Sequence, residues 1–252
     1  MHCQGIGGEY RSTSLVDKVA FDHNGVVLIQ LRVGAEWDNA VIGSMPAEKN
    51  IRQAFFWRQT MSHLPLLPAV PTEPPLSDIL ADLRTLAGPD FEFPNLYRVM
   101  GHSPEMLRAW VAFAWPLRLK ATTSRSLREL LILRGAQVCN AKFEWAHHVP
   151  MAFSAGVSRA QIDALEHWRQ ADCFDARQRA ALRLAEEVSI GPAATPEAIA
   201  ELRACGFTDG EVVELTLTAS FYVCVARFLG SMDMPLEPEY EKYVANGQCR
   251  LP

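Results

Sequence analysis

From residue 77 onward, apolar residues recur every three or four positions, the spacing that places them on one face of an α-helix. This pattern predicts helices at roughly 77–87, 104–118, 125–154, 158–170, 175–189, 196–205 and 209–230. No strand-like alternation competes with it in this part of the chain. Short connections between helices with one apolar face predict a compact all-α bundle.

Residue pairs typical of helix starts support these boundaries. Ser158 with Gln161 and Thr208 with Glu211 fit the capping box, in which each side chain binds a free backbone N–H group of the first turn. Gly156, just before the first of these pairs, fits a helix end. The sequence therefore predicts where neighbouring helices meet as well as where they run.

The first 60 residues have a different pattern. The run "VVLIQLRV" at Val26–Val33 is typical of a β-strand, and the preceding "DHNG" at Asp22–Gly25 favours a tight turn. A short β-hairpin extension is predicted here. Because two strands alone are rarely stable in water, the hairpin would need support from elsewhere.

Five prolines between Pro65 and Pro75 predict an extended, stiff connection, since each proline fixes its own φ and disfavours helix at the residue before it. We therefore divide the chain into an N-terminal extension at 1–60, a proline-rich linker at 61–75 and a helical domain at 76–245. An alternative is that residues 1–60 are an over-extended start and that Met61 is the natural first residue.

Composition excludes several classes of protein. The chain has 252 residues, 49% of them hydrophobic, and a formal net charge of −5, with no clustered basic face of the kind that binds nucleic acid. No apolar run reaches the roughly 20 residues of a membrane span, and the first residues do not resemble a secretory signal. The six cysteines form no CxxC pair. We expect a cytoplasmic protein with reduced cysteines that binds neither nucleic acid nor membrane.

The stretch "CNAKFEWAHH" at Cys139–His148 carries the candidate chemistry. Glu144 and His148 are four positions apart, so they share a helix face and can touch. In a mostly apolar wall such a pair suits proton transfer, because burial and mutual charge move both pKa values. The alternative is that the two groups merely satisfy each other in a packed interface. Glu129 could join them only if the helix breaks within "CNAK".

A metal site would use Glu144 and His147, which form an ExxH pair like those of di-iron helical bundles. Such sites need a second ExxH pair and two further carboxylates. The chain has no second ExxH pair. We therefore expect no metal and no cofactor.

Residues 127–165, "LRELLILRGAQVCNAKFEWAHHVPMAFSAGVSRAQIDAL", resemble the carboxymuconolactone decarboxylase family, which shares its fold with the AhpD alkylhydroperoxidases. The similar features are the glutamate of "REL", the "FEWAHH" core and the "AGVSRAQIDAL" turn and helix. The segment "FYVCVARFLGSMDMPLEPE" resembles the C-terminal part of the same family. The resemblance covers about residues 80–240 and implies an all-α, AhpD-like helical bundle.

The resemblance also assigns positions in the family's CxxCxxxH redox pattern. The two cysteines fall at Ala141 and Glu144, the relay histidine between them at Phe143 and the last histidine at His148. Glu129 takes the place of the upstream glutamate that relays protons. Because both redox cysteines are missing, disulfide-cycling peroxidase activity is not expected.

The acid–base half of the pattern remains, as in the decarboxylase branch of the family. The resemblance implies a cofactor-independent carboxy-lyase, or related proton-transfer enzyme, acting on a small lactone or carbonyl acid. In this hypothesis His148 donates or accepts the proton, Glu144 orients His148 and Glu129 completes the relay. An anionic substrate also needs a cation, for which Arg134 and Arg227 are the candidates.

Two further residues, Cys139 and His147, are also candidates for the site. Cys139, two residues before the expected cysteine position, would serve an alternative peroxidase function, and His147 could contact substrate. A second alternative is a non-catalytic oligomeric binding module. The resemblance implies a homo-oligomer, a trimer or hexamer, in which Trp110, Trp115 and Trp168 either contact a partner or lie in the core.

Overall fold

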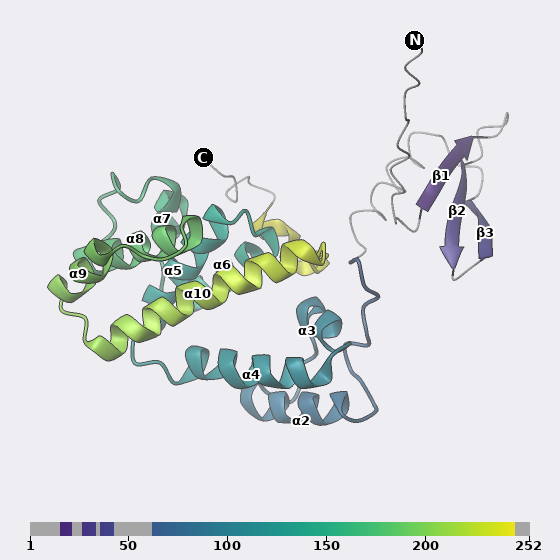
Figure 1. Ribbon diagram of the computed structural model, residues 1–252, viewed down its shortest axis with the longest axis horizontal. Coiled ribbons are helices and arrows are strands. Elements are labelled where there is room, and N and C mark those ends of the chain that lie inside the picture. The colour runs from purple at the N-terminus through teal and green to yellow at the C-terminus, as the bar shows by residue number, and fades with distance from the viewer. Residues whose placement is uncertain (1–15, 22–26, 34–35, 43–61, 245–252) are drawn as a thin grey trace, which may run out of the picture. The chain divides into compact units, whose positions relative to one another are not determined.

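The computed structural model describes residues 16–21, 27–33, 36–42 and 62–244 (Figure 1). The chain divides into two compact units, residues 1–59 and residues 60–252.

In the described part of the first unit, three antiparallel strands form a sheet in the order β1 (Val16–Phe21), β2 (Val27–Val33) and β3 (Glu36–Ile42). The central strand pairs Ile29 with Val19 on one side and with Ala40 on the other. The "DHNG" turn expected from the sequence lies outside the described residues.

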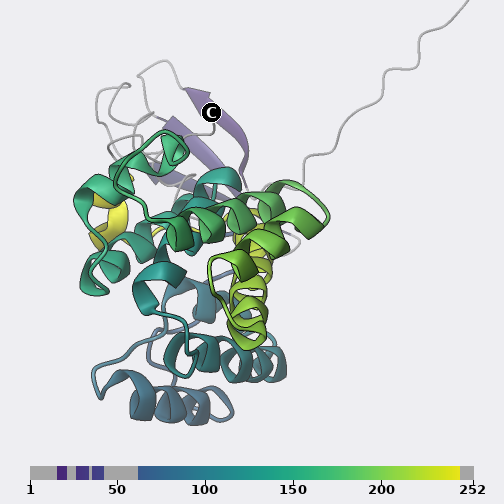
Figure 2. The same cartoon turned by 90° about the vertical axis from the view of Figure 1, so that its left-hand side faces the viewer.

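The second unit is helical throughout, as predicted, and it contains two short 3₁₀ segments at Leu165–His167 and Pro238–Tyr243. In both views, α2 and α4 form the lower edge of the helical unit (Figures 1 and 2). The helices are α2 (Leu76–Ala87), α3 (Asn95–Met100), α4 (Pro104–Leu119), α5 (Arg125–Val138), α6 (Lys142–Ser154), α7 (Arg159–Ala164), α8 (Ala176–Ile190), α9 (Pro196–Ala204) and α10 (Asp209–Ser231).

Two helices replace the single helix predicted at 125–154. The break falls at Asn140, whose φ of 52° lies in the left-handed region that asparagine tolerates better than most residues. The chain can therefore turn within "CNAK", and α6 packs back against α5. The predicted helix 158–170 was too long, because α7 passes into the 3₁₀ segment at Leu165. Helix α3, only six residues long, was not predicted.

Local capping explains where several helices begin. Both predicted capping boxes, at Ser158 and Thr208, are confirmed, and a third is present at Asp175. In each, the side chain of the first residue accepts a hydrogen bond from the backbone three residues later, which satisfies one of the free N–H groups of the helix start. Gly156 ends the preceding turn with a φ of 89°, where a Cβ would be strained.

The core surrounds α5, which is buried on nearly every side. Leu130 and Leu133 pack into one apolar cluster with Trp145, while Leu131 and Ile132 belong to a second cluster on the other side of the helix. A helix that is apolar all round is typical of a central position. Among the described helices, only α10 has the length and hydropathy that a membrane span would need, and it packs along α5 and α8 in the bundle.

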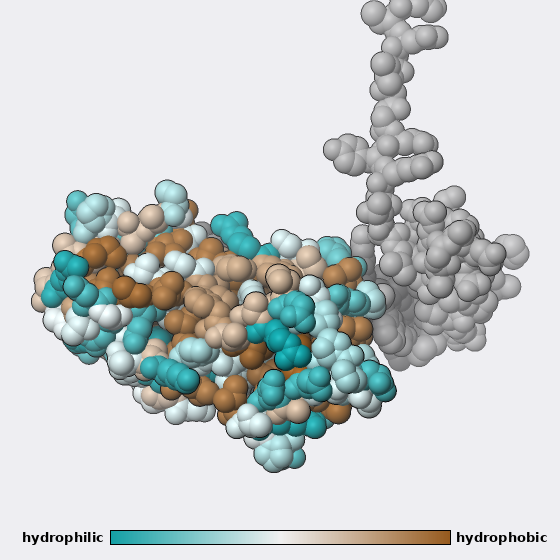
Figure 3. Space-filling view, turned by 60° about the horizontal axis from the view of Figure 1, so that its bottom comes forward, coloured by the Kyte–Doolittle hydropathy of each residue, from teal (hydrophilic) through white to brown (hydrophobic). Residues whose placement is uncertain are grey.

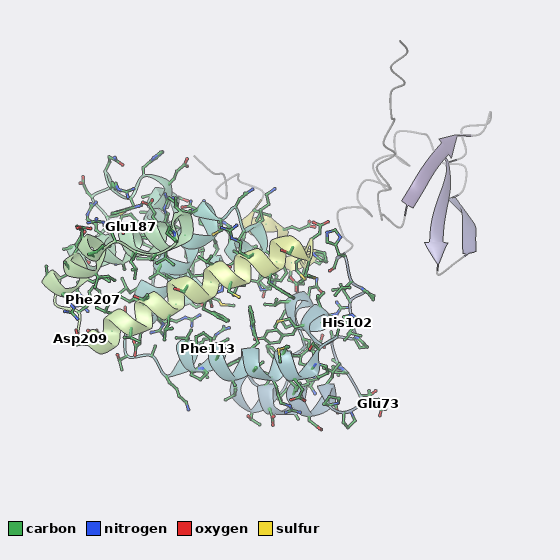
Figure 4. All side chains as sticks on the ribbon, in the orientation of Figure 1. Glu73, His102, Phe113, Glu187, Phe207 and Asp209 are labelled. Carbon is green, nitrogen blue, oxygen red and sulfur yellow. The ribbon has the colours of Figure 1, made fainter. Side chains whose placement is uncertain are left out.

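The proline-rich segment, predicted to be a stiff connection before the helical domain, makes hydrogen bonds to that domain. The backbone N–H of Phe93 donates to the carbonyl of Ala69 at 2.9 Å, and the ring of His102 donates to the carbonyl of Pro65 at 2.8 Å. Arg98 donates to the carbonyl of Leu67. His102 marks this junction in Figure 4. Residues 62–75 thus complete the packing around α3.

We expect a shortened chain starting at Met61 to melt as cooperatively as the full chain and at a similar temperature. The reason is that the helical unit contains its own apolar clusters and keeps residues 62–75. Thermal unfolding followed by circular dichroism measures this. A chain starting at Leu76 is the control and should melt at a lower temperature, since it loses the hydrogen bonds of the proline-rich segment. A large loss of melting temperature in the Met61 chain would contradict the prediction.

Candidate active site

At the candidate site, a hydrogen bond joins helices α5 and α6. Nδ1 of His148, on α6, lies 2.8 Å from Oε2 of Glu129, on α5. The turn at Asn140 makes this contact possible, because it lets α6 run back along α5. A carboxylate can only accept, so Nδ1 donates the proton of this hydrogen bond. In a neutral ring, Nε2 is then the basic nitrogen. Within residues 62–244, no hydrogen bond to Nε2 is present.

Glu129 is held as a carboxylate. Its side chain is fully buried, and Arg125, one turn earlier on α5, forms an ion pair with Oε1. Burial alone would raise the pKa of Glu129, but the facing His148 and Arg125 outweigh it and hold the pKa below its usual range. The spacing of four residues between Arg125 and Glu129 could have revealed this pair from the sequence, where we did not single out Arg125.

Glu144 is buried like Glu129 but, unlike Glu129, it faces no charged or hydrogen-bonding partner within residues 62–244. Its side chain is 2% exposed, and neither carboxyl oxygen has a hydrogen-bond partner among the described residues. Burial raises the pKa of Glu144 well above its usual range. The protonated carboxyl group is therefore favoured to higher pH than in an exposed glutamate, because an unpaired charge in this position would be strongly disfavoured.

His148 is kept neutral. Burial lowers the pKa of its imidazole, and the attraction of Glu129 offsets only part of this effect. The sequence led us to expect that Glu144 orients His148. This was wrong: Glu129 makes the hydrogen bond that fixes the ring, and Glu144 lies one helical turn away without a partner.

Glu144 and His148 both line a cavity of about 780 Å³ between α6, α10 and the layer formed by α2 to α4. The junction of α4 and α10 is visible in Figure 4 at Phe113, whose ring lies 5.2 Å from that of Phe221. Nine aromatic residues line the cavity: Phe91, Phe93, Tyr97, Trp110, Trp115, Phe143, Phe221, Tyr222 and Tyr240. Such a cavity suits a small, flat molecule.

Tyr222 is a site residue that sequence reasoning missed. Its ring meets that of His148 edge-on, with ring centres 4.9 Å apart. Burial raises the pKa of Tyr222 well above its usual range, so its hydroxyl group stays protonated and can donate a hydrogen bond. The segment "FYVCVARFLG" was noted only for its family resemblance, and a tyrosine on an apolar helix gives no separate signal of a site.

The adjacent His147 has different partners from His148. Its Nε2 lies 2.8 Å from Oε2 of Glu237, and its ring is stacked between Phe143 and Tyr240. These contacts tie α6 to the C-terminal 3₁₀ segment and leave His147 on the wall of the cavity. Among the described residues, no group of three or more His, Cys, Asp or Glu side chains could hold a metal ion.

The two arginines proposed from the sequence do not line the cavity. Arg134 is buried and pairs with Glu186 on α8, while Arg227 is exposed on α10. The arginines that line the cavity are instead Arg98, on α3, and Arg118, at the end of α4. Sequence alone could not choose among these residues, because their positions depend on how α4 packs against the bundle.

Cys139 also lies off the cavity. It is half-buried at the C-terminal end of α5 and packs against the apolar cluster that contains Trp145. Burial raises the pKa of its thiol. A thiol with a raised pKa is less often in the reactive thiolate form.

Known proteins with related sequences and folds place this chain in a family. The carboxymuconolactone decarboxylase family model matches residues 104–187. The uncharacterized protein YnjA of Escherichia coli K12 is 30% identical over 139 residues, which cover 55% of this chain and 71% of YnjA.

Solved structures confirm the fold. The AhpD core of an uncharacterized peroxidase-related protein from Ralstonia eutropha JMP134 superposes with a TM-score of 0.61 at 20% identity, covering 71% of this chain and 94% of that one. The debrominase Bmp8, in a complex with 2,3,4-tribromopyrrole, has a TM-score of 0.61 at 20% identity, with 73% and 98% covered. The predicted AhpD-like helical fold is therefore confirmed, and the chain belongs to the carboxymuconolactone decarboxylase family.

Proposed function

We propose that this protein is a cofactor-independent acid–base enzyme, and specifically a carboxy-lyase acting on a small lactone or carbonyl acid. Glu144 is the acid, and His148, oriented by Glu129, handles the second proton. Tyr222 donates a hydrogen bond to an oxygen atom of the substrate. Family membership supports the general class of enzyme, and the specific reaction is our inference from the site.

One observation carries the proposal. Two titratable groups one turn apart on α6 face the same cavity, and their surroundings move their pKa values in opposite directions. Near neutral pH this leaves a protonated carboxyl group beside an unprotonated imidazole. An acid and a base that are both ready to react at the same pH are typical of an enzyme that transfers protons.

The decarboxylation would need no other reagent than a proton. The bond between the substrate carbon and its carboxylate breaks, CO2 leaves and the electron pair moves into a conjugated carbonyl. Glu144 then gives its proton to carbon, and a solvent proton passing through Nε2 of His148 restores the Glu144 carboxyl group. The aromatic walls limit the entry of water, which strengthens the electrostatic effect of each polar group in the cavity.

The direct test is CO2 release from a panel of unsaturated lactone acids and β-keto acids. We expect release with the wild-type protein and with Glu166→Gln, which changes an exposed glutamate on the 3₁₀ segment after α7. Glu144→Gln should lose the activity. Absence of CO2 from every compound, or full activity of Glu144→Gln, would contradict the proposed function and favour a binding module.

The peroxidase alternative finds less support in the site. Cys139 is absent from the walls of the cavity, and burial raises the pKa of its thiol. We expect Cys139→Ala to keep nearly all of the CO2-releasing activity. Activity lost without loss of fold, or a thiol that consumes peroxide rapidly in a titration of the wild-type protein, would favour the peroxidase.

We also propose that the helical unit self-associates as a trimer or hexamer. Trp115 and Trp168 are buried in the core of the protomer. The large exposed apolar residues include Phe113 on α4 and Val213 on α10, and Figure 3 shows apolar surface on one face of the unit. Sedimentation velocity should give the mass of three or six chains. A monomer at micromolar concentration would contradict this proposal.

A further inference from the structure

Two arginines without an ion pair among residues 62–244 line the cavity, Arg98 and Arg118. Arg98 is engaged by the carbonyl of Leu67 and the side chain of Asn95. Arg118 forms no ion pair within residues 62–244. Its side chain reaches the cavity from the last turn of α4, opposite the helix that carries Glu144 and His148.

The only side chain within hydrogen-bond distance of the Arg118 guanidinium, in the part of the chain that the structure describes, is Met151. Nη2 of Arg118 lies 3.3 Å from Sδ of Met151, and Nη2 of Arg125 lies 3.8 Å from the same sulfur atom. A thioether is a weak acceptor and carries no charge. Two guanidinium groups thus converge on an uncharged atom, although like charges repel each other.

Only one of the two positive charges is balanced. Arg125 forms its ion pair with Glu129, and no carboxylate between residues 62 and 244 pairs with Arg118. The guanidinium of Arg118 lies 5.4 Å from the centre of the Trp115 ring, a contact that favours one orientation of the side chain. Besides Glu144, four acidic residues line the cavity. Asp90, Glu92 and Glu239 are exposed, as is Arg118, so solvent screens their charges, and Glu237 is engaged by His147 and by the backbone N–H of Asn95.

Arg118 also lies in the walls of two neighbouring depressions of the surface. It lines the aromatic cavity and the adjoining groove, where Arg125 and Met151 lie beside it. A carboxylate placed over Met151 could therefore bind both guanidinium groups, while an attached ring extended into the aromatic cavity toward Glu144 and His148. Guanidinium groups are well suited to this task, because their N–H groups match the two oxygen atoms of a carboxylate.

We propose that Arg118 and Arg125 form a carboxylate-binding site over Met151 that selects small, planar monocarboxylates, with the ring held by the aromatic walls. This proposal rests on the proposed function in one respect, since Glu144 and His148 are taken as the reacting end of the cavity. Binding itself requires no reaction. The site can therefore be tested even if the chemistry at Glu144 and His148 differs from that proposed above.

The test compares benzoate with benzamide, a neutral molecule of nearly the same shape, by calorimetric titration and by quenching of tryptophan fluorescence. Trp110 and Trp115 line the cavity and should report occupancy. We expect the wild-type protein to bind benzoate more tightly than benzamide, and the difference to shrink as salt is added. Equal affinity for the two compounds, or no binding of benzoate, would overturn the proposal.

Arg118→Gln should weaken benzoate binding by about 10- to 100-fold and leave benzamide binding unchanged, because a charge-assisted hydrogen bond is lost. Arg118→Lys should keep part of the preference for benzoate. Arg108→Gln is the matched control, since Arg108 lies on the same helix and pairs with exposed Asp82. Unchanged benzoate affinity in Arg118→Gln, or an equal loss in Arg108→Gln, would overturn the assignment. Normal benzoate binding without CO2 release from any compound would refute the proposed function alone.

Discussion

His148→Gln is expected to lower turnover by about 10²- to 10⁴-fold, the usual contribution of a positioned acid or base. Glutamine keeps a polar group of similar size beside Glu129, but it cannot take up and release a proton near neutral pH. Substrate binding should change less than rate, because Arg118 and the aromatic walls are untouched. Turnover and affinity are measured on the same preparation, together with the melting temperature.

A purely structural histidine would give a different result. Loss of the hydrogen bond to Glu129 would then lower the free energy of unfolding by roughly 1–3 kcal/mol through an unsatisfied buried partner, while the folded protein kept its full turnover. His167→Gln is the control, since His167 is exposed in the 3₁₀ segment after α7. A destabilised but fully active His148→Gln protein would remove His148 from the mechanism.

Glu144→Gln is expected to lower turnover by a similar factor of about 10² to 10⁴ and, unlike most changes in an active site, to make the protein more stable at alkaline pH. The folded state holds the Glu144 proton, whereas the unfolded chain releases it above the ordinary pKa of 4.5. The unfolded state therefore binds fewer protons in this range, and stability falls as pH rises. The decrease is about 1.4 kcal/mol for each pH unit up to the folded pKa.

Glutamine does not ionise in this pH range, so the free energy of unfolding of the variant lacks this decrease with pH. The melting temperature of Glu144→Gln should exceed that of the wild type at pH 8, and the difference should shrink toward pH 5. One kcal/mol corresponds to roughly 2–4 °C in a protein of this size. Glu166→Gln should show no such trend. A constant difference across the pH range would mean that Glu144 titrates normally in the folded protein.

The helices of the second unit could be predicted from the sequence because apolar spacing and capping pairs are local signals. Ser158 and Thr208 begin helices where their capping boxes predict. The turn at Asn140 was harder to place, since an asparagine in the left-handed conformation leaves no mark in the apolar pattern. The role of residues 62–75 was missed because a proline-rich segment looks the same in sequence whether it is free or bound to a neighbouring helix.

The sequence singled out three side chains but not the contacts between them. Glu129, Glu144 and His148 were candidates from spacing and resemblance. The structure joins Glu129 to His148 by a hydrogen bond and places Glu144 and His148 on the cavity, and their catalytic roles stay predictions. Which glutamate holds His148 depended on the angle between α5 and α6, which is a tertiary property. The same is true of Arg118, which lies on a helix outside the stretch that carries the family pattern.

The central claim is that Glu144 is a neutral carboxyl group beside an unprotonated His148, and a carbon-13 NMR titration of protein labelled at the glutamate carboxyl carbons tests it most directly. The account predicts one carboxyl resonance that remains in the protonated position through pH 7 and is absent from the spectrum of Glu144→Gln. The other glutamates, including Glu129, should be ionised at that pH. A spectrum in which every glutamate has lost its proton by pH 6 would contradict the account.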